Sequence, residues 1–137
     1  QALVGFLRGE RQQTRNLGVE LETPCCAVTL SALDSQPIAR SGSLLLTVCG
    51  PVANTGLAWN SERTSLTDWG QSPTTIEAVR GGVTLRDLEG ASRVMRQALD
   101  GGGAPLGKAI EAARSGGGWR FPVGEPATTW YRLVVER

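Results

Sequence analysis

Short segments in which apolar and polar residues alternate recur along this sequence, and glycine is frequent between them. The clearest cases are residues 19–22, 119–123 and 131–135, where every second residue is apolar. A period of two is typical of a strand with one buried face. Glycine, of which the chain has 18, supplies the backbone conformations that tight turns need. This pattern predicts an all-β fold, a two-sheet antiparallel β-sandwich of about eight to ten short strands.

The rest of the chain divides into further strands and one irregular region. Three apolar runs predict additional strands at residues 2–7, 27–33 and 43–49. Residues 50–73 show no clean period, and we expect a long loop with one short strand there. Residues 75–79 and 83–86 are interpreted as a hairpin around Gly81-Gly82.

Residues 85–99 are ambiguous between helix and strand. Their apolar residues fall at helical spacing, but Gly90 would weaken a helix by about 1 kcal/mol relative to Ala. A repeated turn pattern favours a strand at residues 93–99, because in each copy Leu-Asp ends a strand and Pro opens the next. The two copies are Ala32-Leu33-Asp34 before Pro37 and Ala98-Leu99-Asp100 before Pro105. Residues 106–113 have the same ambiguity, which stays open.

The alternation also assigns core residues, because a period of two places every second side chain on one face. We expect six side chains to be buried in the core: Val28, Leu45, Trp119, Phe121, Tyr131 and Leu133. Trp130 then lies on the face opposite Tyr131, where it lines either the second face of the sandwich or a contact with another domain.

Histidine is absent from the chain. Its absence excludes nucleophile systems that use histidine as the base, and histidine-based zinc and copper sites. The three cysteines, Cys25, Cys26 and Cys49, form no Cys-x-x-Cys pair, and we expect no metal site and no cofactor. A Cys25–Cys49 or a Cys26–Cys49 disulfide stays open, but small buried thiols are the favoured interpretation.

The charges are nearly balanced, since 14 Lys and Arg residues and 13 Asp and Glu residues give a formal net charge of +1. Nucleic-acid binding depends on clustered basic residues, and we expect no nucleic-acid partner. No apolar run reaches the roughly 18 residues of a membrane span, and we expect no membrane partner. The 137 residues suit one domain, residues 1–137. Because the chain begins in an apolar stretch without Met, we expect a domain excised from a larger multidomain enzyme.

Several motifs of the chain resemble a recurring C-terminal module of bacterial glycoside hydrolases. They are Val28-Thr29-Leu30-Ser31-Ala32-Leu33-Asp34, Leu44-Leu45-Leu46-Thr47-Val48, Asn54-Thr55-Gly56, Trp59-Asn60, Arg63-Thr64-Ser65, Asp68-Trp69-Gly70, Val123-Gly124-Glu125-Pro126 and Thr129-Trp130-Tyr131. In such enzymes a (β/α)8 barrel carries catalysis, and a β-sandwich follows it, packs against it and can bind glycan. The resemblance implies an all-β sandwich in which residues 85–99 hold a strand. It also implies a secreted, extracellular protein whose partners are a polysaccharide or oligosaccharide and the catalytic barrel domain of the parent enzyme.

Aromatic and polar residues interleave in the centre of the chain, and we interpret them as a carbohydrate-binding site. Four Trp stand beside only one Tyr and two Phe. A flat indole covers the apolar face of a sugar ring, while amide, carboxylate and guanidinium groups bond its hydroxyls. The candidate carbohydrate-binding residues are Trp59, Asn60, Arg63, Asp68, Trp69, Gln71 and Trp130. The alternative is that Trp59 and Trp69 are buried structural residues.

Two functions remain in competition after a third is disfavoured. The first is a non-catalytic carbohydrate-binding module, and the second is a structural domain that packs against and stabilises a catalytic (β/α)8 barrel without binding glycan. An independent enzyme is disfavoured, since a glycosidase needs two carboxyl groups facing one sugar bond and Glu62, Asp68 and Glu77 lack a barrel-strand context. Exposed, coplanar indoles favour the first function, and an apolar patch with scattered Trp favours the second.

Overall fold

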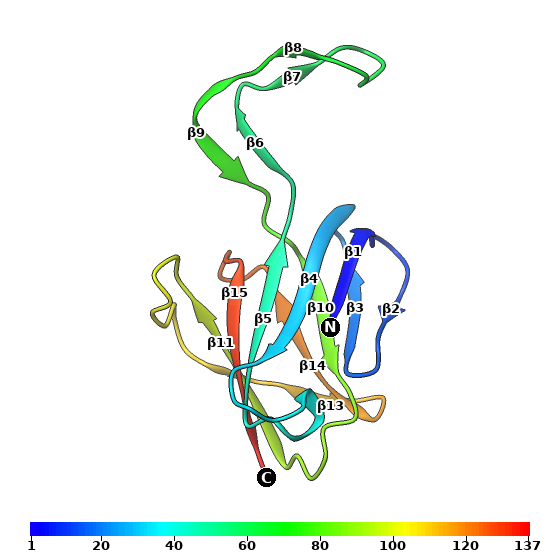
Figure 1. The fold of residues 1–137 in the computed structure, drawn as a ribbon, viewed down its shortest axis with the longest axis vertical. Helices are drawn as coiled ribbons and strands as arrows, with labels where there is room; N and C mark the ends of the chain where they lie inside the picture. Colours follow the sequence, from blue (N-terminus) through cyan, green and yellow to red (C-terminus); the bar gives the residue numbers. More distant parts are fainter.

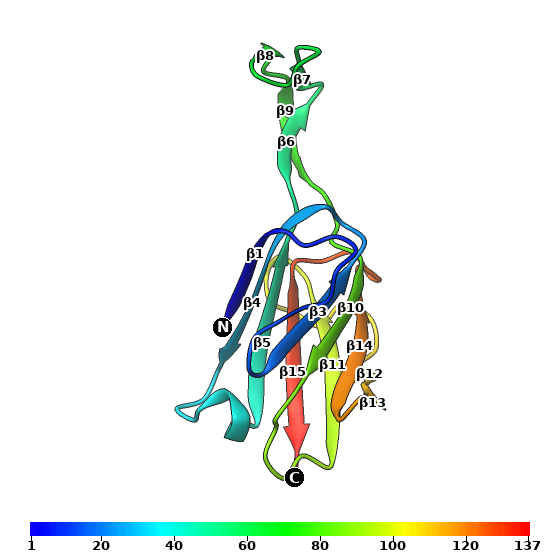
Figure 2. The same ribbon diagram turned by 90° about the vertical axis from the view of Figure 1, so that its right-hand side faces the viewer.

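Two antiparallel β-sheets packed face to face form the body of the molecule, and a narrow arm projects from one end (Figure 1). This computed structural model describes all residues from 1 to 137. Figure 2, turned by 90°, shows the two sheets in profile and the arm continuing along the long axis. The predicted fold class, a two-sheet antiparallel β-sandwich, is confirmed.

Sheet A has six strands and sheet B has five, slightly more in total than the eight to ten expected. In spatial order sheet A consists of β1 (Ala2–Phe6), β4 (Cys25–Ala32), β5 (Ser43–Cys49), β15 (Trp130–Glu136), β11 (Arg93–Leu99) and β12 (Ile110–Glu111). Sheet B consists of β13 (Ala113–Ser115), β14 (Gly118–Val123), β10 (Gly81–Leu85), β3 (Leu17–Leu21) and β2 (Gln12–Gln13). A 3-10 turn, Ile38–Arg40, connects β4 to β5.

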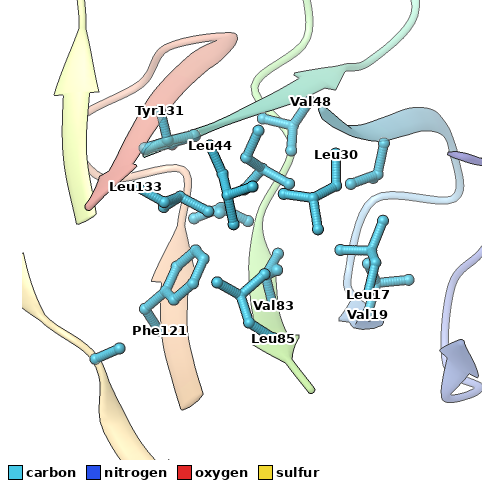
Figure 3. Close-up of a cluster of buried hydrophobic side chains, with 14 of the residues drawn as sticks. Leu17, Val19, Leu30, Leu44, Val48, Val83, Leu85, Phe121, Tyr131 and Leu133 are labelled. Carbon is cyan, nitrogen blue, oxygen red and sulfur yellow. The ribbon is translucent and has the colours of Figure 1, made fainter. Parts of the chain in front are cut away.

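The alternation of residues along the strands builds a core between the sheets. In β5 and β11 every second side chain is buried. Figure 3 shows Leu44 and Leu133 of sheet A pointing toward Phe121 and Val83 of sheet B. The result is one hydrophobic cluster of 23 buried residues, so removal of apolar surface from water is the main stabilising contribution.

Five of the six core predictions are confirmed, and one is wrong. The buried residues are Val28, Trp119, Phe121, Tyr131 and Leu133. Leu45 instead lies half-buried on the outer face of sheet A, because Leu44 and Leu46 take the core-facing positions of β5. Three consecutive leucines give no period of two, so the pattern does not identify the buried face there.

Residues 93–99 form strand β11, as the repeated turn pattern predicts, and no α-helix lies between residues 85 and 99. Asp87 and Gly90 have positive φ angles of 49° and 66°. Such a left-handed backbone does not continue a right-handed helix, which is why helical spacing fails here. Residues 106–113 are also not helical, and they contain β12 and the first residue of β13.

The hairpin expected around Gly81-Gly82 is wrong. Both glycines lie inside β10, which pairs with β3 on one side and β14 on the other. Gly82 has a steric role, since the Arg120 side chain lies over it and a Cβ at this position would come within 2.8 Å of the guanidinium. Glycine at this point therefore marks a close approach inside a sheet and not a turn.

The long loop expected at residues 50–73 is instead an ordered arm, residues 52–76. It contains β6 (Val52–Thr55) paired with β9 (Gln71–Ile76), and β7 (Ala58–Trp59) paired with β8 (Leu66–Asp68). The arm leaves sheet A after β5 and returns to sheet B at β10 (Figure 1). Gly50 permits its two chains to meet at the base, because a Cβ there would lie 2.3 Å from the carbonyl oxygen of Glu77.

Arg96 is a buried cation inside the sandwich. Its side chain is fully buried, and its guanidinium donates to the carbonyl oxygens of Pro122 and Glu125 at 3.2 Å. Burial lowers the pKa of Arg96, and the guanidinium lies 5.0 Å from the centre of the Tyr131 ring. The Tyr131 hydroxyl accepts a hydrogen bond from the Gly124 N–H at 2.9 Å. Arg96 and Tyr131 together hold the segment between β14 and β15 against sheet A.

The three cysteines are free thiols, so neither of the two disulfides is formed. Cys49 lies opposite Ala27 and not opposite a cysteine. Cys26 faces the core, where burial raises the pKa of its thiol, in agreement with the buried-thiol interpretation. Cys25 and Cys49 differ, because both lie half-buried on the outer face of sheet A.

Candidate functional site

The seven candidate residues fall into two groups on different parts of the molecule. Six of them lie on the arm: Trp59, Asn60, Arg63, Asp68, Trp69 and Gln71. Trp130 is the first residue of β15, between Thr47 of β5 and Leu99 of β11. Its side chain lies on the outer face of sheet A, as expected from its position beside the buried Tyr131.

Hydrogen bonds within the arm set its shape. The pairs Val52–Ile76 and Asn54–Thr74 stand opposite each other in the β6–β9 ribbon, and the register shifts after Asn54. The Thr74 hydroxyl donates to Asn54 Oδ1 at 2.8 Å, and the Thr55 hydroxyl donates to the Pro73 carbonyl oxygen at 2.8 Å. A bulge of this kind increases the local twist of a ribbon, and these side chains stabilise it.

The turn at the tip of the arm is built around Asn60. Its Oδ1 accepts hydrogen bonds from the backbone N–H groups of Thr64 at 2.9 Å and Ser65 at 3.3 Å. Its Nδ2 donates to the Thr64 hydroxyl at 2.9 Å, and Arg63 takes a positive φ of 53° inside the turn. Local side-chain to backbone bonds of this type are the reason Asn favours turns. The Asn60 amide is therefore engaged in holding the tip.

The second turn near the indoles is held by Asp68. Its Oδ1 accepts a hydrogen bond from the Gly70 N–H at 2.8 Å, and Gly70 has a positive φ of 65°. The Asn54 amide donates to the Trp69 carbonyl oxygen at 3.1 Å, which ties this turn to β6. Gln71 begins β9 and is exposed. Two of the four polar side chains expected to bond sugar hydroxyls, Asn60 and Asp68, thus serve the arm's own backbone.

Both indoles of the arm are exposed, which excludes their being buried structural residues. Trp59 is 49% exposed and Trp69 is 74% exposed. No residue from 52 to 76 is buried. A two-stranded ribbon alone is at best marginally stable in water, so this arm lacks the apolar packing that supports other strands of the molecule.

The outer face of sheet A carries an apolar band at the end from which the arm leaves, and we call it the apolar face. Its apolar members are the outward side chains of Val4, Phe6, Cys25, Ala27, Leu45, Cys49, Leu99 and Trp130. The outward Thr29 and Thr47 lie among them, in register with Trp130. Phe6 on the edge strand is 87% exposed, and Trp130 is 38% exposed. Apolar residues on both faces of a sheet are typical of a sheet covered on both faces.

Charged groups are sparse on this part of sheet A. Arg132 stands opposite Leu45 on the neighbouring strand and forms no ion pair. Its Nε donates to the Ser43 hydroxyl at 3.4 Å. Arg93, paired with Glu111 at 2.9 Å and with Glu136 at 3.7 Å, lies at the opposite end of the sheet. The apolar face is therefore suited to contact with another apolar surface, with one unpaired guanidinium at its border.

The sequence contains a signal for the apolar face that the strand assignment alone did not use. Residues 44–46 are a continuous apolar run, so β5 presents apolar side chains on both faces. Sequence reasoning identified only Trp130 on this surface. Phe6 and Leu45 belong to it as well.

Further features delimit the chemistry available to the chain. No cluster of three or more His, Cys, Asp or Glu side chains is placed to hold a metal ion. None of the helical structure is long and apolar enough to cross a membrane.

Comparison with family models, with curated proteins and with solved structures finds no match to this chain.

Proposed function

We propose that this chain is a non-catalytic accessory domain that docks onto a larger folded domain through its apolar face and its arm. The observation that carries the proposal is that one end of the molecule combines an uncovered apolar sheet face with an arm that has no core of its own. The partner implied by the resemblance is the catalytic (β/α)8 barrel of a polysaccharide-degrading enzyme.

The exposed aromatic residues supply the energetic argument. Burying a side chain of the size of Phe6 stabilises a contact by roughly 1.5–3 kcal/mol, and Phe6 is the most exposed large apolar residue of the sandwich. Trp is among the residue types that dominate protein contacts when buried at their centre. Trp130 and Phe6 lie on the same outer face of sheet A, so a partner that covers both has to span the sheet from β1 to β15.

The carboxylates near the indoles support a non-catalytic role. Glycoside hydrolysis needs two carboxyl groups facing one sugar bond. Glu62 lies in the turn between β7 and β8, whereas Glu77 follows β9 at the base of the arm, so the length of the β6–β9 ribbon separates them. Asp68, between them in sequence, is bonded to the Gly70 N–H.

Calorimetric titration with the separately expressed barrel domain of the parent enzyme tests the docking role. We expect Phe6→Ser and Trp130→Ser each to weaken association about tenfold or more. Ile110→Ser is the matched control, because Ile110 is an exposed apolar strand residue outside the apolar face and the arm. Equal affinities for the parent chain, the two docking variants and the control contradict the proposal.

Carbohydrate binding at the arm is the second candidate, and the exposure of Trp59 and Trp69 favours it. In this case an indole stacks on a sugar ring, and Arg63 and Gln71 bond its hydroxyls. The test is retention on insoluble polysaccharide, where Trp69→Ala and Trp59→Ala should abolish binding without a change in melting temperature. Retention equal to that of the parent chain argues against this candidate.

A further inference from the structure

Strand β1 is a free edge of sheet A, because β4 is its only neighbour in the sheet (Figure 1). Along an antiparallel pair, successive residues turn their main-chain N–H and C=O groups alternately toward the partner strand and away from it. Gln1 exchanges both main-chain hydrogen bonds with Leu30 at 2.8 Å, and the Leu7 N–H donates to the Pro24 carbonyl oxygen at 2.9 Å. Odd-numbered residues therefore face β4, and even-numbered residues turn these groups away from it.

The outward main-chain groups of β1 have no partner within the chain. Ala2, Val4 and Phe6 each present one N–H and one C=O group at this edge, and no hydrogen bond from another part of the molecule reaches them. Val4 is 70% exposed and Phe6 is 87% exposed, so no loop covers the strand. A row of unpaired main-chain groups at the edge of a sheet is a template for a further strand.

The other three edge strands of the two sheets differ from β1. β12 has two residues, of which Glu111 pairs with Arg93, and β13 has three residues, with Arg114 at its centre. β2 consists of two glutamines. Short length and charge are the usual means by which edge strands avoid pairing with other chains. β1 has neither, since it is five residues long and no side chain from residue 1 to 7 is charged.

The sequence of β1 is complementary to itself in one antiparallel register, with a two-fold axis at Val4. Ala2 then stands opposite Phe6 of the second copy, and every outward N–H and C=O group of both strands finds a partner. Large side chains also meet small ones on both faces, because Phe6 faces Ala2 on the outer side and Leu3 faces Gly5 on the inner side. Val4 meets its own copy at the centre, and no like charges oppose each other.

We propose that β1 binds β1 of a second copy of this chain, so that the chain forms a two-fold dimer with sheet A continuous across the contact. This contact lies in the plane of sheet A, whereas docking covers its outer face, so it goes beyond the docking role and does not depend on it. A two-fold contact is closed, and assembly stops at the dimer. One strand from each copy forms a small interface, and we expect a dissociation constant on the order of 10–100 µM.

Sedimentation velocity of the 137-residue chain, between about 1 µM and 1 mM, tests for the dimer. We expect monomer at the lowest concentration and mostly dimer at the highest. A chain that stays monomeric at about 1 mM overturns the proposal. Assembly into species larger than a dimer also overturns it, because a two-fold contact leaves no free copy of the same edge.

Amide hydrogen exchange over the same concentrations locates the contact. The N–H groups of Ala2, Val4 and Phe6 should exchange fast at about 1 µM and become protected as the dimer forms. Those of Leu3 and Gly5 should be protected at every concentration, because they face β4. A dimer in which the three outward amides stay unprotected overturns the proposal.

Variants of Val4 separate strand pairing from other contacts. Val4→Pro removes the outward N–H at the axis without removing a donor to β4, and Val4→Lys places two like charges side by side there. Each should weaken dimerisation at least tenfold with an unchanged melting temperature. Val4→Thr keeps the N–H and the β-branched shape and is the matched control, and Ile110→Lys places the same charge at the other edge of sheet A. Both controls should dimerise like the parent chain. A dimer that persists in Val4→Pro and Val4→Lys, or that is lost in Ile110→Lys, overturns β1 as the contact.

Discussion

Adjacent leucines on one strand allow a direct test of which face of β5 forms the core. Leu44 is completely buried between Ala32 and Leu133, whereas Leu45 is half-buried on the outer face between Ser31 and Arg132. Leu→Ala removes three carbon atoms, which costs about 2.4 kcal/mol at roughly 0.8 kcal/mol per methylene. The cavity at a buried site raises the total to about 2–5 kcal/mol.

We therefore expect Leu44→Ala to lower the free energy of unfolding by about 2–5 kcal/mol, and Leu45→Ala to lower it by about 1 kcal/mol or less. For a chain of this length the first change corresponds to a decrease of roughly 6–20 °C in melting temperature. Urea denaturation followed by far-ultraviolet circular dichroism measures both variants under one protocol. Equal losses, or a larger loss for Leu45→Ala, refute the assignment of the two faces.

Three further predictions concern a buried cation, acid sensitivity and the arm. Arg96→Met keeps the side-chain length but removes the donors to the Pro122 and Glu125 carbonyl oxygens, so urea denaturation should show a loss of about 1–3 kcal/mol in the free energy of unfolding. A gain in stability contradicts the role given to Arg96. Because Arg120 lowers the pKa of Glu20, the stabilisation from this pair is present above the ordinary glutamate pKa of the unfolded chain and is lost as pH falls through the lower folded value. The chain has no histidine, so the melting temperature should stay level between about pH 5 and 8 and decrease below about pH 4. A change in melting temperature centred near pH 6.5 contradicts this prediction. Replacing residues 53–75 by Asn-Gly should join Val52 to Ile76, which face each other in the ribbon. The free energy of unfolding should change by less than about 1 kcal/mol, because the sandwich does not depend on the arm for its stability. Loss of the cooperative melting transition contradicts this prediction.

The alternating strands of the sandwich were predictable because one face of each is buried and the other is polar. Trp119 and Phe121 are core residues for this reason, and so are Tyr131 and Leu133. The same logic fails for residues 44–46, since apolar side chains on both faces remove the contrast on which the period depends. The cause is the apolar face itself, which sequence periodicity cannot distinguish from a core.

The arm was not predictable from periodicity, because none of its residues is buried and no face of it selects apolar side chains. Local turn chemistry forms it, through the bonds of Asn60 to the Thr64 and Ser65 N–H groups and of Asp68 to the Gly70 N–H. The interleaved aromatic and polar residues did identify it as unusual. Their role in glycan binding stays a prediction.

Amide hydrogen exchange tests the docking account most directly, by comparing the isolated 137-residue chain with the proposed parent polypeptide, in which the chain is joined to a (β/α)8 barrel domain. Exposed backbone groups of a ribbon without a core exchange fast in the isolated chain. In the parent polypeptide we expect strong protection of residues 52–76 and of the free edge of β1, with unchanged exchange in β3 and β10 of sheet B. Equal exchange of the arm and of β1 in the two proteins contradicts the account.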